Sequence, residues 1–137
     1  NPACGDPVIY YSDMLGKPYK YGGVKPDTGV DCLWVARTIL ERIYEDFPSS
    51  AMPLSQREAD SAIRNAMSGN CGWRKISWPD KIGDVVFGLL EDEHNYVGVL
   101  VDVSGRNVLT AIPEHGVVLI PYRKLKGVVG CVRWVGL

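Results

Sequence analysis

The stretch TGVDCLW, which covers residues 28–34, places a cysteine directly after an aspartate. Asp31 is a good helix N-cap, because its carboxylate can accept hydrogen bonds from the free N–H groups of a first turn. Cys32 would then lie in that turn, where the helix dipole stabilises a thiolate, the form of cysteine that attacks carbonyl carbon. The same position also suits a small buried side chain on the inner face of the helix. Cys32 is therefore a candidate nucleophile, and a structural role is the alternative.

Three glycines precede this cysteine in the loop of residues 22–29. Glycine lets a substrate approach the backbone closely, and the N–H groups of the helix start can serve as an oxyanion hole. A cysteine nucleophile also needs a base, which is commonly histidine. The chain contains only His94 and His115. An imidazole base for Cys32 must be one of these two.

Three helices are predicted in the first half of the chain. The first follows the start signal Asp-Pro and covers residues 6–15, before a glycine. The second covers residues 31–46, where apolar side chains recur at helical spacing. The third begins with a capping box and covers residues 55–68, followed by Gly69.

From Trp73 onward, short segments rich in β-branched and aromatic residues predict strands. These segments cover residues 84–90, 96–103, 107–112, 117–122 and 130–135. Their connections are too short for helical crossovers, so the sheet should be antiparallel. Residues 1–137 are thus expected to form one α+β domain, with N-terminal helices packed on a C-terminal sheet of about five or six strands.

Composition narrows the function classes. The length of 137 residues suits one domain, and a net charge of −1 argues against a general nucleic-acid-binding surface. No apolar run reaches the ~20 residues of a membrane span. The opening residues show no signal-peptide pattern, and since residue 1 is Asn rather than Met, a processed or trimmed start stays open.

Four widely spaced cysteines disfavour a zinc site, because the cysteines of such sites are typically paired and closely spaced. A disulfide framework is not expected either, because a chain of this length can do without one. The four cysteines are Cys4, Cys32, Cys71 and Cys131. Three of the four are expected to be small buried side chains. No metal or other cofactor is expected.

The segment GKPYKYGGVKPDTGVDC, residues 16–32, resembles the nucleophile segment of the NlpC/P60 cysteine peptidases. The family pattern is a Gly-x-Pro-Tyr, an aromatic-Gly-Gly, a short loop and an Asp-Cys that opens a helix. GDVVF at residues 83–87 and YVGVLVD at residues 96–102 resemble two later strands. Residues 116–134 resemble the last strands, especially in phage-tail and gene-transfer-agent members with a final Gly-x-x-Arg. The likeness covers nearly the whole chain.

The resemblance implies a papain-like fold and an endopeptidase that cuts murein stem peptides, usually between γ-D-glutamate and a diamino acid. By position, Cys32 matches the nucleophile, Asp31 the residue before it, and Tyr19 a tyrosine beside it. The substrate groove would be lined by Tyr21, Trp34 and Tyr96. The tail-type likeness implies a tail-tip or baseplate component that acts during host entry. Its place would be the virion or the cell envelope, and its partners stem peptides and other tail or baseplate proteins.

Several positions depart from the family pattern. Trp34 replaces a glycine, and its bulk favours packing or a groove wall. Tyr96 stands where the base histidine belongs, and a neutral tyrosine with a pKa near 10 accepts a thiol proton poorly. His94 lies two residues upstream on the same face of a continuing strand, so it is the base if a bulge closes that ~6–7 Å step. The family's orienting histidine falls near Thr110, and His115 is a further candidate for that role.

Three functions follow from these residues. The first is an active murein endopeptidase, which the retained Tyr19, Asp31 and Cys32 favour. The second is a catalytically impaired structural module of a phage tail, which Trp34 and the missing histidines favour. The third, an acyltransferase or amidase of the same fold, would require an apolar acyl groove.

Overall fold

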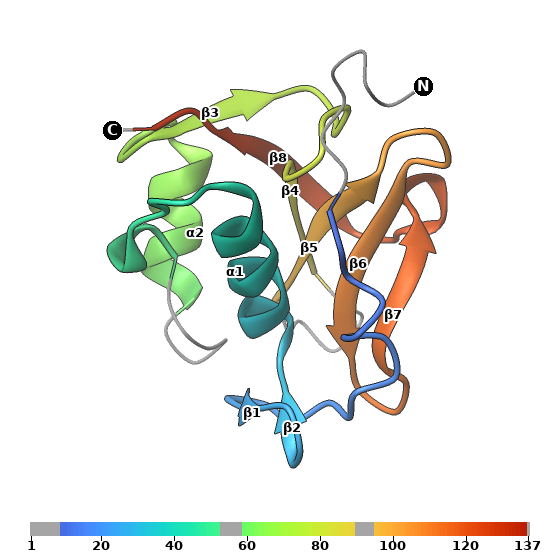
Figure 1. Ribbon diagram of the computed structural model, residues 1–137. Coiled ribbons are helices and arrows are strands. Elements are labelled where there is room, and N and C mark those ends of the chain that lie inside the picture. The colour runs from blue at the N-terminus through green and yellow to red at the C-terminus, as the bar shows by residue number, and fades with distance from the viewer. Residues whose placement is uncertain (1–8, 53–58, 90–94, 137) are drawn as a thin grey trace.

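The structure is a computed structural model that describes residues 9–52, 59–89 and 95–136 (Figure 1). Two helices pack on one face of a six-stranded antiparallel sheet, so the predicted α+β class is confirmed (Figure 1). The strand order is β3-β8-β4-β5-β6-β7. No helix in the described ranges is long and apolar enough to cross a membrane.

The helices are α1 (Cys32–Ile43) and α2 (Ala59–Met67), with short 3-10 helices η2 (Ser49–Ala51) and η4 (Tyr122–Lys124). The sheet strands are β3 (Trp73–Ile76), β4 (Val85–Leu89), β5 (Asn95–Asp102), β6 (Asn107–Ile112), β7 (Gly116–Pro121) and β8 (Val128–Trp134). A separate hairpin consists of β1 (Val24–Lys25) and β2 (Gly29–Val30).

The five predicted strand segments correspond to β4 through β8 and differ from them by at most two residues at either end. The hairpin β1–β2 and the edge strand β3 are not among the predicted strands. Both are short, and only Trp73 of β3 is buried, so neither has a strong alternating pattern. The six strands agree with the predicted strand number.

The helix predicted from the Asp-Cys pair is confirmed as α1. The Asp31 carboxylate accepts a hydrogen bond from the Trp34 N–H at 3.0 Å. The helix ends at Ile43, three residues before the predicted end, because Tyr44 has an extended backbone. This early end lets Phe47 turn back onto the rings of Trp73 and Trp134, whose centroids lie 6.2 and 5.0 Å from its own.

The helix predicted over residues 6–15 is wrong in its described part, residues 9–15. Residues 12–16 form turns, and the stretch before them has no regular structure. Met14 is completely buried, and the Gly16 N–H donates to the Val117 carbonyl of β7 at 3.0 Å. These tertiary contacts outweigh a local cap signal in a segment too short to be a stable helix alone. The start signal itself lies outside the described residues.

The predicted third helix is confirmed over Ala59–Met67, and Gly69 follows it with a positive φ of 78°. Its predicted capping box, residues 55–58, lies outside the described residues. On the inner side, Ala66 is buried and Met67 packs against the main core.

Two apolar clusters lie on opposite faces of the sheet. The larger one joins α1 and α2 to the sheet and contains Leu40, Val99 and Leu109. The smaller one contains Leu100 and Val108. Successive residues of a strand point to opposite faces, so the sheet has a helix-covered face and an opposite face.

Two motifs that are far apart in the sequence meet in an ion pair. Arg133 of β8 donates to both carboxylate oxygens of Asp84, at 2.8 and 2.7 Å. Asp84 is 1% exposed and also accepts hydrogen bonds from the N–H groups of Asp80 and Lys81, each at 2.9 Å. The Gly-Asp and Gly-x-x-Arg segments of the resemblance are therefore one structural unit.

Candidate active site around Cys32

The loop before Cys32 is folded tightly against the start of α1. The Gly23 N–H donates to the Lys20 carbonyl at 2.8 Å, and the Asp31 N–H donates to the Gly23 carbonyl at 3.1 Å. A Cβ atom at Gly23 would collide with the carbonyl of Gly29. Only glycine allows this close approach, so the Gly-Gly pair positions Asp31 and Cys32.

Cys32 is the first residue of α1 and is only 1% exposed. Its Sγ accepts a hydrogen bond from the Val97 N–H of β5 at 3.3 Å. Burial raises the pKa of this thiol to about 12, and the Asp31 carboxylate adds to the rise, although the bond from Val97 opposes it. The thiol is therefore neutral near pH 7, because burial raises its pKa by more than the helix N-terminus lowers it.

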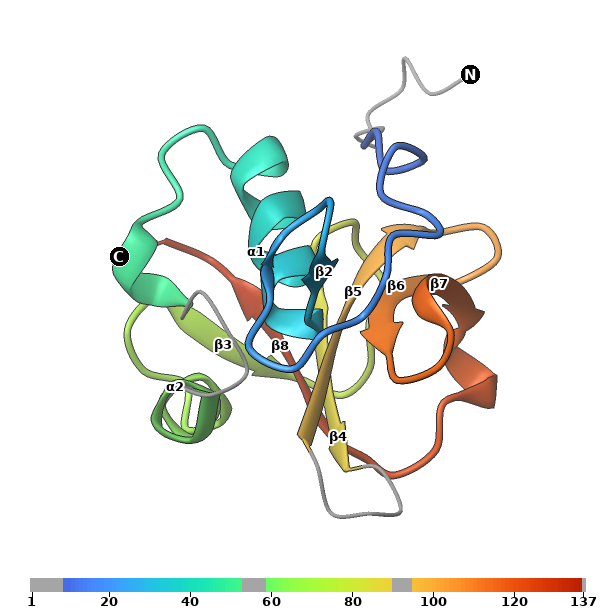
Figure 2. The ribbon, with the colours of Figure 1, turned by 90° about the horizontal axis from the view of Figure 1, so that it is seen from below.

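Val97 also fixes Thr110. The hydrogen-bonded register of β5 and β6 begins at Val99 and Leu109. Nearer the start of β5, the Val97 carbonyl accepts a hydrogen bond from Thr110 Oγ1 at 2.7 Å. The side chains of Cys32 and Thr110 thus bond to the N–H and to the carbonyl of the same residue, Val97. Figure 2 shows β2 leading into α1 close to β5 and β6, where this junction lies.

Tyr96 does not act on the thiol in this arrangement. Its hydroxyl donates to the Lys126 carbonyl at 2.8 Å, and burial raises its pKa to about 12. Its ring lies over Gly88 of β4, where a Cβ atom would collide with it. Along β5, Tyr96 and Val97 alternate between the faces of the sheet. The tyrosine at the expected base position is thus locked by packing and by a main-chain bond.

Tyr19 and Tyr21 lie in the loop before Cys32, and Trp34 lies in the first turn of α1. His94 lies outside the described residues. Tyr19 forms a parallel bridge with Val30 beside the hairpin, and Tyr21 is 45% exposed. Trp34 is half-buried and packs against the main core, which agrees with the predicted packing role.

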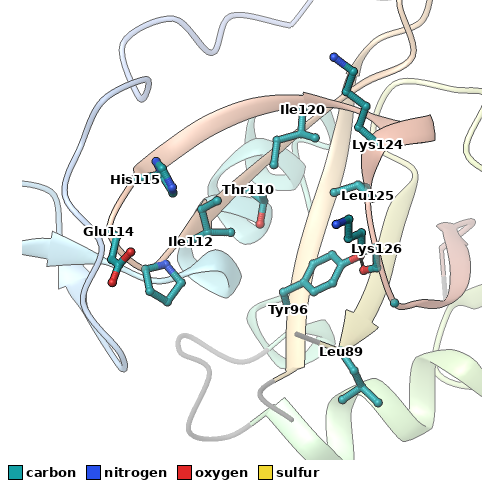
Figure 3. Close-up of a pocket in the computed structure, with 12 residues that line it drawn as sticks. Leu89, Tyr96, Thr110, Ile112, Glu114, His115, Ile120, Lys124, Leu125 and Lys126 are labelled. Carbon is teal, nitrogen blue, oxygen red and sulfur yellow. Dashed lines mark hydrogen bonds between the residues drawn. The ribbon is translucent and has the colours of Figure 1, made fainter. Parts of the chain in front are cut away.

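His115 lies in the β6–β7 turn and lines a pocket of about 800 Å³ (Figure 3). Tyr96 and Thr110 also line this pocket, whereas Cys32 is not among its described lining residues. The pocket therefore does not supply the acyl groove at the thiol that an acyltransferase would need. Sequence reasoning missed Lys124 and Lys126 of this pocket, although their basic run, RKLK, was visible.

The remaining cysteines are free thiols in the described part of the chain. Cys131 is buried, as Cys32 is, whereas Cys71 is exposed, so the predicted three buried cysteines depend on Cys4. Cys4 lies outside the described residues. Within the described ranges, no three His, Cys, Asp or Glu side chains are grouped as metal ligands would be.

No model of a known protein family matches this chain, and no curated protein sequence matches it. Function must therefore be argued from the residues and their geometry.

Proposed function

We propose that this chain is a catalytically silent, NlpC/P60-like module with a papain-like arrangement of elements. It retains the framework around a cysteine nucleophile and uses it as a structural support. The observation that carries the proposal is the junction at Val97, where a buried, neutral Cys32 thiol and Thr110 both bond to the main chain of β5.

The framework supports the family likeness. Asp31 caps α1, and Cys32 opens the helix against the sheet, as the Asp-Cys motif implies. Gly23 lets the preceding loop close on α1. The Asp84–Arg133 pair gives a structural reason for the two later motifs.

The residues at the two positions where the family has histidines support the absence of catalysis. By the resemblance, Tyr96 stands at the base and Thr110 at the orienting group. The Tyr96 hydroxyl donates to the Lys126 carbonyl at 2.8 Å and the Thr110 hydroxyl to the Val97 carbonyl at 2.7 Å, so both are used in main-chain contacts. A thiol with a pKa of about 12 is not the nucleophile unless a base takes its proton.

We propose further that the module belongs to a phage tail tip or baseplate, in the virion, with other tail proteins as partners. This rests on the likeness of residues 116–134 to tail-type members. In that setting the fold would contribute to assembly rather than to cleavage.

A second candidate is the active murein endopeptidase. It is favoured by the place of Cys32 in the first turn of α1, where helix N–H groups can hold an oxyanion. His94 would take the thiol proton, and the thiolate would attack the stem-peptide carbonyl. The protonated histidine would give its proton to the leaving amine, and water would release the acyl group.

The deciding experiment is digestion of purified muropeptides by the wild-type chain, by Cys32→Ala and by Cys71→Ala, read by mass spectrometry. The silent module predicts no fragments from any of the three, under conditions where a known peptidase of this type cleaves. Cleavage by the wild-type chain and Cys71→Ala, but not by Cys32→Ala, would establish the peptidase instead. His94→Ala would then test the base.

A further inference from the structure

The pocket of about 800 Å³ lies on the face of the sheet opposite the helices. Its strand residues Thr110 and Ile112 alternate along β6 with Leu109 and Ala111, which belong to the helix-covered core. Ile120, paired with Val108, brings β7 into the same wall. Regular strands thus form the floor, and a pocket of this size is typical of a binding site for a small ligand or a few residues of peptide.

Charges of opposite sign stand on two sides of this pocket (Figure 3). Lys124 and Lys126 come from the segment after β7, and Glu114 comes from the β6–β7 turn beside His115. All four side chains are exposed. Lys124, Lys126 and Glu114 form no ion pair with any other residue that the structure describes.

Apolar side chains lie between these charges. Ile112, Ile120 and Leu125 all line the pocket and are only partly buried. An occupant that covers them would remove apolar surface from water. It would also meet two lysines at one side and a carboxylate at the other.

We propose that this pocket binds a short peptide segment of a partner protein, with an apolar side chain over Ile112 and Ile120 and an acidic residue beside Lys124 and Lys126. A basic or amino group of the same segment faces Glu114. This arrangement of opposite charges favours a peptide, which can carry both signs, over a fatty acid, which carries a carboxylate alone and offers nothing to Glu114. The proposal is independent of catalysis at Cys32, which does not line the pocket.

The test is selection of randomised octapeptides on the immobilised full chain, followed by affinity measurement on the enriched peptides. The pocket variant is Lys124→Glu with Lys126→Glu. The matched control is Lys25→Glu, an exposed lysine on β1. Enriched peptides should share an acidic residue near an apolar one and should bind the pocket variant about tenfold or more weakly, because like charges then face each other. The control should bind them as the wild type does.

A second selection guards against simple loss of folding. The double variant should keep the far-UV circular dichroism of the wild type and should enrich peptides with a basic residue in place of the acidic one. The proposal is overturned if no peptide is enriched on the wild type, or if the enriched peptides bind both variants equally. It is also overturned if dodecanoate binds the pocket and the peptides do not displace it.

Discussion

At the scale of single residues, two opposing effects act on Cys32. A helix start stabilises a nearby negative charge by roughly 0.3–1 kcal/mol. Burial raises the thiol pKa from about 9 to about 12, which corresponds to roughly 4 kcal/mol against the thiolate. Burial is the larger effect, so the thiol stays protonated and acts as an acceptor for the Val97 N–H.

This balance predicts how Cys32 reacts. In the folded protein at pH 8, iodoacetamide should label the exposed Cys71 and leave Cys32 unlabelled, because only a solvent-accessible thiolate is alkylated. Peptide mapping by mass spectrometry measures both sites. Equal labelling of Cys32 and Cys71 without unfolding would contradict the buried, neutral thiol.

The same pKa predicts a pH dependence of stability. Between about pH 9 and pH 12 the folded chain holds a proton on Cys32 that the unfolded chain has lost. Its contribution is therefore fully present below about pH 9 and falls by roughly 1.4 kcal/mol for each pH unit above it. Urea unfolding at pH 8 and pH 10.5 should show that the free energy of unfolding falls more between these pH values for the wild type than for Cys32→Ala. A Cys71→Ala control should keep the wild-type slope.

At the scale of elements, Arg133 joins β8 to the turn that precedes β4. Its guanidinium binds the buried Asp84 carboxylate with two hydrogen bonds, and Asp84 in turn holds two N–H groups of residues 80–81. Hydrogen bonding to Asp84 raises the pKa of Arg133 further above its ordinary value, so the guanidinium stays charged. Removal of one partner leaves a buried charge without compensation.

Arg133→Leu should therefore lower the free energy of unfolding by about 3 kcal/mol, because Asp84 stays buried without its cationic partner. Arg123→Leu, at an exposed position in η4, is the matched control and should change it by less than about 0.5 kcal/mol. Chemical unfolding measures both. The double variant Asp84→Asn with Arg133→Leu should lose less free energy of unfolding than the two single variants together. Strict additivity would contradict the coupling of the two side chains.

At the scale of the whole molecule, the segment before the hairpin ties α1 to the far edge of the sheet. Asp13 forms a bidentate pair with Arg42 of α1, with both distances 2.8 Å. Three and four residues later, Gly16 and Lys17 exchange main-chain hydrogen bonds with Val117 of β7. The irregular segment thus links α1, which ends at Ile43, to β7, which begins only at Gly116.

Met14 anchors this segment, since its side chain is completely buried in the main core. Met14→Ala should lower the free energy of unfolding by about 2–5 kcal/mol, as expected for a truncated core side chain. Leu15→Ala, at a position 42% exposed, should change it by less than about 0.5 kcal/mol. Urea unfolding followed by tryptophan fluorescence and by circular dichroism should give coincident transitions. Similar losses for the two variants would contradict the anchoring role.

Local features were predicted well from the sequence. Asp31 caps α1, and the buried Ala36, Ile39 and Leu40 follow the predicted helical spacing. The predicted strands agree closely with β4 through β8, because their alternation depends on near neighbours. The helix predicted over residues 6–15 is wrong in its described part, residues 9–15, for the opposite reason, since Asp13 is bound by Arg42 of α1 and Met14 is buried in the main core.

By itself, therefore, the sequence determined where a cysteine would open a helix and that an antiparallel sheet would follow. These properties depend on caps, turns and periodicity, which act over a few residues. Only the tertiary structure decided whether the thiol of that cysteine is protonated. Its hydrogen-bond partner, Val97, lies 65 residues further along the chain, and burial by distant elements sets its pKa. Ionisation depends on solvent, and the exclusion of solvent is a property of the assembled fold.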